Sequence, residues 1–373
     1  MRSPRVIIHG GYGYGNLGDD VLFQVIADMF NSEEHRDTVR FSSWVQSSYV
    51  RRLNPYAQFL KPWSRIRQED LLVFGGGTQH YSFPLTGSRS PWGKLARVGR
   101  DPQRALGVAI ARFRKRQMKY PTRVAAIGIG LGPFSSESAE SKARELVLRA
   151  DYLWVRDERS FRQASKWGAR KVELSPDLAF LYHPRKPLEQ RWQKSGRIAF
   201  VPRDWPHTLE GAAHLKPMLV AAKMLRRYGC DPQFLLFKGK GDKFCYDEIR
   251  RAGEKVWCWT PQTQAIDDAF SFLAHFDVVV SARYHGVVLS AIANVAPIAA
   301  NIEPKLAGCK EAFGGTVPLW DPPFDSDELV SMVLNILDGR VDRVAISQCV
   351  ERHRVAAEGA RCRFMTWLKT AFA

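Results

Sequence analysis

Short apolar runs alternate with amphipathic stretches through the first half of the chain. The apolar runs predict strands and the amphipathic stretches, whose apolar residues recur every three or four positions, predict helices. Strands that are apolar throughout and separated by helices are typical of a parallel sheet covered on both faces. The predicted strands span residues 5–10, 38–44, 71–77, 123–130 and 151–157, and the predicted helices 21–30, 104–119, 140–148 and 160–168.

The same alternation begins again near residue 198, after a segment rich in proline and basic residues. We therefore predict an α/β protein with two doubly wound, Rossmann-like domains facing a cleft. The expected boundaries are 1–183 for the first domain, 184–197 for a linker, 198–345 for the second domain and 346–373 for a C-terminal helix that packs back across the junction. In the second domain, strands are predicted at 198–203, 234–239, 277–283 and 297–302, and helices at 214–227, 245–251, 265–275 and 286–293.

The first predicted strand runs into "GYGYGNLGDD", which contains the GxGxxG spacing of dinucleotide-binding domains. A dinucleotide site needs a helix N-terminus open to a pyrophosphate and a carboxylate after the second strand. Here Asp19 and Asp20 follow the third glycine directly, and the second predicted strand ends without an acid. The sequence therefore argues against NAD.

Two interpretations of this glycine-rich turn remain. Asn16, Asp19 and Asp20 can cap the following helix, where carboxylates suit the positive end of the helix dipole. Alternatively, the glycines let a ligand approach the backbone, and the polar rim suits a hydroxyl-rich ligand such as a sugar. Further glycine turns, "FGGGTQ" with Gly77 and "GIGLGPF", are predicted after the third and fourth strands, at the same edge of a parallel sheet.

The segment "SARYHG" places Arg283 and His285 at the end of a predicted strand. Alternation along a strand predicts that both side chains point the same way. A guanidinium for a carboxylate or phosphate, beside an imidazole that titrates near neutral pH, suits acid catalysis on an anionic substrate. The alternative is a buried Arg283 paired with a structural acid.

Other basic residues also follow predicted strands. Arg156, Arg203 and Lys305 lie at strand ends and are predicted to converge with Arg283 on a small polyanion. The alternative is that some of them are solvated surface charges. The acidic triplet at residues 325–327 resembles a metal-binding DxD motif, but its position before an amphipathic stretch favours a helix cap.

The formal net charge of +17 favours an anionic partner. Residues 88–123 hold eleven Lys or Arg against one acid, with an apolar stripe at Leu106, Ile110 and Phe113. We hypothesise that this surface docks on an anionic membrane or on the diphosphate of a lipid-linked oligosaccharide; the alternative is a core-facing stripe with a solvated basic back. No spanning segment, signal peptide or paired-cysteine metal motif is recognisable, so we expect a cytoplasmic protein, peripheral at the inner face of the membrane, with no metal site.

Together the motifs "GYGYGNLGDD", "FGGGTQ", "GIGLGPF", "VRDERSFRQASKWG" with "LSPDLAF", and "SARYHGVVLSAIANVAPIAANIEPK" resemble those of the polysaccharide pyruvyl transferases. The resemblance runs in order from Arg5 to Lys305. It implies a GT-B-like fold and the transfer of pyruvate from phosphoenolpyruvate to two hydroxyls of a sugar, which forms a cyclic ketal and releases phosphate. Tyr284 stands where the family commonly has leucine.

The resemblance implies that Arg156 and Arg283 bind phosphoenolpyruvate, that His285 is the catalytic acid or base, and that Asn16 and Asp20 lie on the acceptor side. From position alone we add Arg203 and Lys305 to the phosphoenolpyruvate site and Asp19 and Gly77 to the acceptor site, with Asp20 as the second catalytic group. No cofactor is expected, since phosphoenolpyruvate is itself a substrate, and the acceptor is a sugar of a polysaccharide or its lipid-linked precursor.

Two other functions remain open. A GT-B glycosyltransferase could use the same cations for the diphosphate of a nucleotide sugar, with Glu303 on the ribose. A non-catalytic binder of polysaccharide or nucleic acid would fit the net charge, but it leaves the placement of Arg283 and His285 unexplained, so we expect no nucleic-acid partner.

Overall fold

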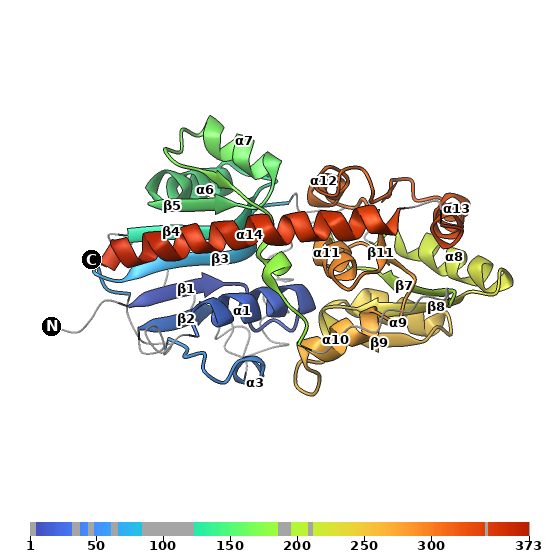
Figure 1. Ribbon diagram of the computed structural model, residues 1–373. Coiled ribbons are helices and arrows are strands. Elements are labelled where there is room, and N and C mark those ends of the chain that lie inside the picture. The colour runs from blue at the N-terminus through green and yellow to red at the C-terminus, as the bar shows by residue number, and fades with distance from the viewer. Residues whose placement is uncertain are drawn as a thin grey trace, which may run out of the picture. The chain divides into compact units, whose positions relative to one another are not determined.

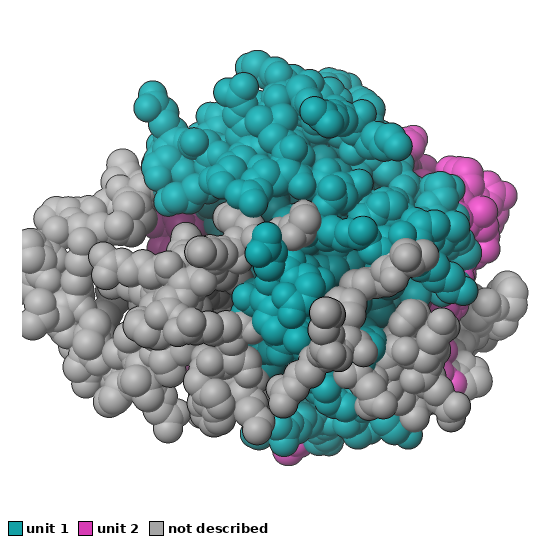
Figure 2. Space-filling model, turned by 90° about the vertical axis from the view of Figure 1, so that its left-hand side faces the viewer, with its two compact units in different colours: residues 1–14, 22–178, 359–373 teal, residues 15–21, 179–358 magenta. Residues whose placement is uncertain are grey.

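The computed structural model describes residues 5–31, 38–43, 48–60, 66–83, 123–185, 195–207, 212–339 and 342–372. The chain forms two compact units (Figure 2). The first consists of residues 1–14, 22–178 and 359–373, and the second of residues 15–21 and 179–358. Each unit contains one six-stranded parallel sheet with helices packed on it (Figure 1).

The first sheet has the strand order β2-β1-β3-β4-β5-β6. Five of these strands lie where the apolar runs predict them, because most residues of each run are buried. The two-residue β6 was not predicted, since so short a strand leaves no pattern. The strands are β1 (Val6–Gly10), β2 (Val39–Ser43), β3 (Leu71–His80), β4 (Arg123–Leu131), β5 (Tyr152–Val155) and β6 (Glu173–Leu174).

The second sheet has the order β12-β11-β10-β7-β8-β9. The chain starts in the middle at β7, builds β8 and β9 on one side, and then crosses to β10, β11 and β12 on the other. The strands are β7 (Arg197–Val201), β8 (Asp231–Leu236), β9 (Val256–Cys258), β10 (Val278–Ser281), β11 (Ala296–Ala300) and β12 (Leu319–Trp320). The short β9 and β12 were not predicted.

The helices follow the strands as the doubly wound prediction requires. The helices of the first half are α1 (Leu17–Met29), α3 (Val50–Leu53), α6 (Glu137–Arg149) and α7 (Glu158–Lys166), followed by the 3₁₀ turn η1 (Leu178–Leu181). In the second unit, α8 (Leu215–Arg227) and α13 (Ser326–Leu337) pack against each other (Figure 1). Those of the second half are α8 (Leu215–Arg227), α9 (Lys243–Arg251), α10 (Ile266–Leu273), α11 (Tyr284–Ile292), α12 (Pro304–Ala312), α13 (Ser326–Leu337) and α14 (Arg343–Phe372), with the 3₁₀ turn η2 (Gly239–Gly241) before α9.

Two predicted segments fall largely or wholly outside the described residues. The helix at 104–119 and nearly all of the basic surface at 88–123 lie there, so the membrane-docking hypothesis stays a prediction. Most of the predicted linker, residues 186–194, lies there too. The last helix, α14, contributes residues 343–358 to the second unit and its remainder to the first. In the described residues, no helix is long and apolar enough to cross a membrane.

The glycine stretches of the first unit differ from the prediction. Gly75–Gly77 and Gly128–Gly130 lie inside β3 and β4 instead of forming turns after them. The ring of Tyr12 is buried against β1 and β3 at Gly10 and Gly75, and its hydroxyl donates a hydrogen bond of 2.7 Å to the carbonyl of Gly75. A Cβ atom at Gly10 would lie 2.2 Å from this ring, so Gly10 makes room for the protein's own tyrosine. At Gly10, which precedes the glycine-rich turn, Tyr12 fills the space in front of the backbone, so a ligand cannot approach it there.

Candidate functional site

The second sheet has a topological switch point between β7 and β10. If the six strands of this sheet are numbered one to six in chain order, so that β7 is strand one and β10 is strand four, their spatial order is 3-2-1-4-5-6. This is the strand order of dinucleotide-binding folds. In such sheets ligands bind outside the carboxyl ends of the two strands at the switch. Arg203 comes two residues after β7, and Arg283 comes two residues after β10. Both arginines thus emerge where this fold binds its ligands.

The backbone around Arg283 differs from the predicted strand. β10 ends at Ser281, Arg283 is the N-cap residue of α11, and His285 lies in the first turn of that helix. The hydroxyl of Ser281 accepts a hydrogen bond from the amide of Arg283 (3.0 Å) and donates one to its carbonyl (2.9 Å), which turns the chain out of the strand. The predicted strand alternation of Arg283 and His285 is therefore wrong. The two residues remain neighbours at a helix start.

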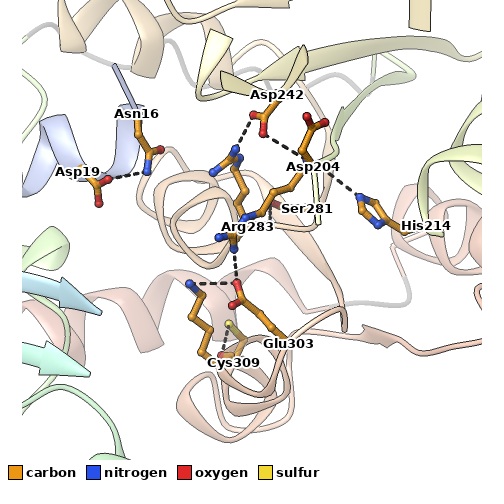
Figure 3. Close-up of polar contacts among 11 residues, drawn as sticks. Asn16, Asp19, Asp204, His214, Asp242, Ser281, Arg283, Glu303 and Cys309 are labelled. Atoms are coloured by element: carbon orange, nitrogen blue, oxygen red, sulfur yellow. Dashed lines mark hydrogen bonds and ion pairs between the residues drawn. The ribbon is translucent and has the colours of Figure 1, made fainter. Parts of the chain in front are cut away.

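The guanidinium of Arg283 is buried and forms an ion pair with Asp242, which follows the turn η2 and is the N-cap residue of α9 (Figure 3). Asp242 also accepts a hydrogen bond from the amide of Asp204 (3.3 Å). The carboxylate of Asp204 in turn accepts from the amides of Phe244 and Cys245, at the N-terminus of α9. The structure thus shows the alternative that the sequence left open, a buried Arg283 paired with an acid. This ion pair fixes Arg283 at the switch point.

Arg203 and Lys305 share the carboxylate of Glu303, at 2.5 and 3.0 Å. The Arg203 guanidinium also lies over the ring of Trp205, 4.7 Å from its centroid. Cation–π contact and ion pair together hold Arg203 beside β7 and α12. The structure therefore brings these two predicted cations together through Glu303. From the sequence alone, Glu303 had been given a role only in the glycosyltransferase alternative.

His214 supports this arrangement from within the core. Its Nε2 accepts a hydrogen bond of 3.2 Å from the amide of Arg203. Burial, with Arg203 and Arg283 nearby, lowers the pKa of His214 to about 3, so the ring is neutral at physiological pH. A neutral ring can keep Nε2 as the acceptor and so fix the turn after β7.

Lys238 is a residue of this group that sequence reasoning missed. It follows β8 in the segment "LFKGKGD", a lysine- and glycine-rich turn at a strand end that could have been recognised. Its side chain is half-buried, and burial, reinforced by the charge of Arg283, lowers its pKa. Arg203, Asp242 and Asp19 also act on it electrostatically.

The start of α1 belongs to the same compact unit. The amide of Leu17 donates a hydrogen bond of 2.9 Å to the carbonyl of Phe237, just after β8. Asn16 donates to the carboxylate of Asp19 at 2.7 Å (Figure 3), whereas Asp20 is buried and accepts a bond of 2.7 Å from the indole of Trp259. Asp19 is thus the more exposed carboxylate, and Asp20 anchors the helix start.

Gly18 and His285 are in direct contact. A Cβ atom at Gly18 would lie 2.4 Å from Nδ1 of His285, so the imidazole packs on bare backbone. We expect Gly18→Ala to displace His285 and therefore to lower the kcat of the enzyme about tenfold or more, as loss of a positioned acid or base does. Steady-state kinetics measure kcat, and circular dichroism should show little change in the fold. Gly308→Ala in α12 is the matched control, because a Cβ there meets nothing within 4 Å. Equal kcat for both variants would contradict the placement of His285.

The predicted residues of the first unit are held by their own partners. Arg156 is buried against Gly130 and bonds Asp177 at 2.8 Å, with Asp157 at 3.5 Å. Gly77 lies inside β3 with a positive φ of 76°. Their roles in substrate binding stay predictions.

The acidic triplet at 325–327 is a helix cap, as predicted: Asp325 is the N-cap residue of α13 and accepts a bond of 2.8 Å from the amide of Glu328. Within the described ranges, no cluster of three or more His, Cys, Asp or Glu side chains could hold a metal ion.

Comparison with known proteins gives a family and a fold. The model of the family "Polysaccharide pyruvyl transferase" matches residues 16–303. A search among curated proteins found no match.

The structure is similar to Anabaena HepE in complex with UDP-glucose (15% identity, 97% of this chain and 99% of that chain, TM-score 0.52). It is also similar to UDP-N-acetylglucosamine 2-epimerase from Rickettsia bellii (12% identity, 99% of this chain and 98% of that chain, TM-score 0.55). A third similar structure is UDP-GlcNAc 2-epimerase from Neisseria meningitidis bound to UDP-GlcNAc (10% identity, 98% of this chain and 100% of that chain, TM-score 0.52). These likenesses confirm the predicted two-domain, GT-B-like α/β fold.

Proposed function

The chain belongs to the polysaccharide pyruvyl transferase family, and from this premise we propose that it transfers the pyruvyl group of phosphoenolpyruvate to two hydroxyls of a sugar. The product is a cyclic ketal on a polysaccharide or its precursor, and phosphate is released. The observation that carries the proposal is the set of cations at the switch point, with His285 in the first turn of the helix that Arg283 caps. A small substrate with a carboxylate and a phosphate matches clustered cations better than a neutral donor does.

The reaction needs an acid for the donor. Protonation of the methylene carbon of phosphoenolpyruvate gives an oxocarbenium-like centre that a sugar hydroxyl attacks. His285 can deliver this proton, and a positioned acid of this kind contributes about 10²- to 10⁴-fold to rate. The second hydroxyl then attacks the same carbon as the C–O bond to phosphate breaks, its proton leaves with the departing phosphate, and the ring closes.

The reaction also needs a base for the attacking hydroxyl. We assign this role to Asp19, which is half-buried and is held by Asn16, in place of Asp20. Asp20 is 1% exposed and bonded to Trp259, which suits a positioning role. Lys238 interacts electrostatically with Asp19, which places a cation beside the proposed base.

A nucleotide-sugar transferase is the second candidate, because HepE was solved with UDP-glucose. In that alternative, Glu303 is the residue that we assigned to the ribose. Glu303 is 5% exposed and already bonded to Arg203 and Lys305, which favours phosphoenolpyruvate.

The test is to incubate the protein with phosphoenolpyruvate and a panel of galactosides, glucosides and mannosides, and to measure phosphate release. We expect release that depends on one acceptor class. Turnover of UDP-glucose, with no phosphate from phosphoenolpyruvate on any acceptor, would overturn the proposal.

A further inference from the structure

Lys238 differs from the other cations of the switch point in its partners. Arg283 is paired with Asp242, and Arg203 and Lys305 share Glu303. Among the described residues, the ammonium of Lys238 has no hydrogen-bonded or ion-paired acid. A half-buried lysine without such a partner carries a desolvation cost that a bound anion would offset.

The position of Lys238 is built into the turn that follows β8. Its stem crosses Gly241, where a Cβ atom would lie 2.6–2.7 Å from Cγ, Cδ and Cε. Gly241 is itself exposed, and the next residue, Asp242, holds Arg283. The missing side chain at Gly241 therefore lets the lysine stem lie along the turn, near Arg203 and Arg283.

We propose that Lys238 is a further substrate-binding residue, whose ammonium receives the phosphate group of phosphoenolpyruvate. This inference rests on the proposed function. The division of roles follows from chemistry: planar guanidinium groups match a planar carboxylate, and the compact ammonium of lysine binds phosphate as a point charge. No covalent step is involved, and the phosphate later leaves from this position.

The pH dependence of binding gives a second readout. Burial and the adjacent Arg283 and Arg203 lower the pKa of Lys238, against the opposing effect of Asp242 and Asp19. The charged form binds phosphate, so affinity falls as pH rises through this lowered pKa. We expect an alkaline loss of phosphoenolpyruvate affinity in the wild type that is absent from Lys238→Met.

The test is calorimetric titration of the wild type, Lys238→Met and Gly241→Ala with phosphoenolpyruvate, inorganic phosphate and pyruvate. We expect Lys238→Met to weaken phosphoenolpyruvate and phosphate about 10- to 100-fold and to leave pyruvate unchanged. Gly241→Ala keeps the charge but displaces the stem, so it should weaken the same two ligands. Lys223→Met, on the exposed face of α8, and Gly308→Ala are the matched controls.

The outcomes separate this inference from the proposed function. Equal phosphoenolpyruvate affinity for wild type and Lys238→Met, or a loss confined to pyruvate, overturns the role of Lys238 and leaves the function standing. If the wild type binds UDP-glucose but not phosphoenolpyruvate, the proposed function is wrong. The assignment of the phosphoenolpyruvate phosphate to Lys238 is then wrong as well.

Discussion

His285→Asn is expected to lower kcat of pyruvyl transfer about 10²- to 10⁴-fold and to change the Kd of phosphoenolpyruvate little. The imidazole is the group that we assign to protonate the donor, and it packs on the backbone of Gly18 in the first turn of α11. Asparagine keeps a polar side chain of similar width but carries no proton at neutral pH that it can donate to carbon. Steady-state kinetics and calorimetric titration measure the two effects separately.

His183→Asn is the control for this variant, because His183 is exposed and lies outside the switch point. Its kcat should equal that of the wild type. A kcat for His285→Asn within threefold of the control, with phosphoenolpyruvate bound normally, would show that another group supplies the proton.

Arg283→Met is expected to lower the free energy of unfolding by about 3–5 kcal/mol. Removing the guanidinium leaves Asp242 charged and almost fully buried, with only 2% of its side chain exposed. The same change removes a cation from the proposed donor site, so phosphoenolpyruvate binding should be lost as well. Urea denaturation measures stability, and calorimetry measures binding.

The double variant Arg283→Met/Asp242→Asn separates the two effects. A neutral amide at residue 242 removes the buried charge, so stability should recover in part while binding stays lost. Arg251→Met, which breaks an exposed pair with Glu248, should change stability by less than about 1 kcal/mol. A loss as small as this control for Arg283→Met would contradict the buried ion pair.

The architecture could be predicted because its cause is local. Each central strand is an apolar run buried on both faces, as Val278–Ser281 in β10 illustrates. The short β6, β9 and β12 could not be predicted, since two or three residues carry no periodicity. The course of the chain after β10 was predicted wrongly. The hydroxyl of Ser281 ends the strand through hydrogen bonds to the backbone of Arg283, and the alternation of apolar and polar residues does not reveal such bonds.

The site could be predicted only as far as single residues at strand ends. Arg203 and Arg283 were found from position, but their acids come from distant segments: Asp242 is 41 residues from Arg283, and Glu303 is 100 residues from Arg203. The packing roles of Gly10 and Gly18 could not be predicted for the same reason. Gly10 makes room for Tyr12, whose hydroxyl bonds Gly75 63 residues away, and Gly18 makes room for His285. Packing between distant segments decides these roles.

Transfer in heavy water tests the central claim most directly. The protein is incubated in D₂O with phosphoenolpyruvate and an accepted sugar, and the product is analysed by mass spectrometry and NMR. If the donor is protonated at its methylene carbon, the product is a cyclic ketal whose methyl group carries solvent deuterium, and phosphate is released. A pyruvylated product without deuterium in that methyl group, or a sugar transferred from UDP-glucose instead, would contradict it.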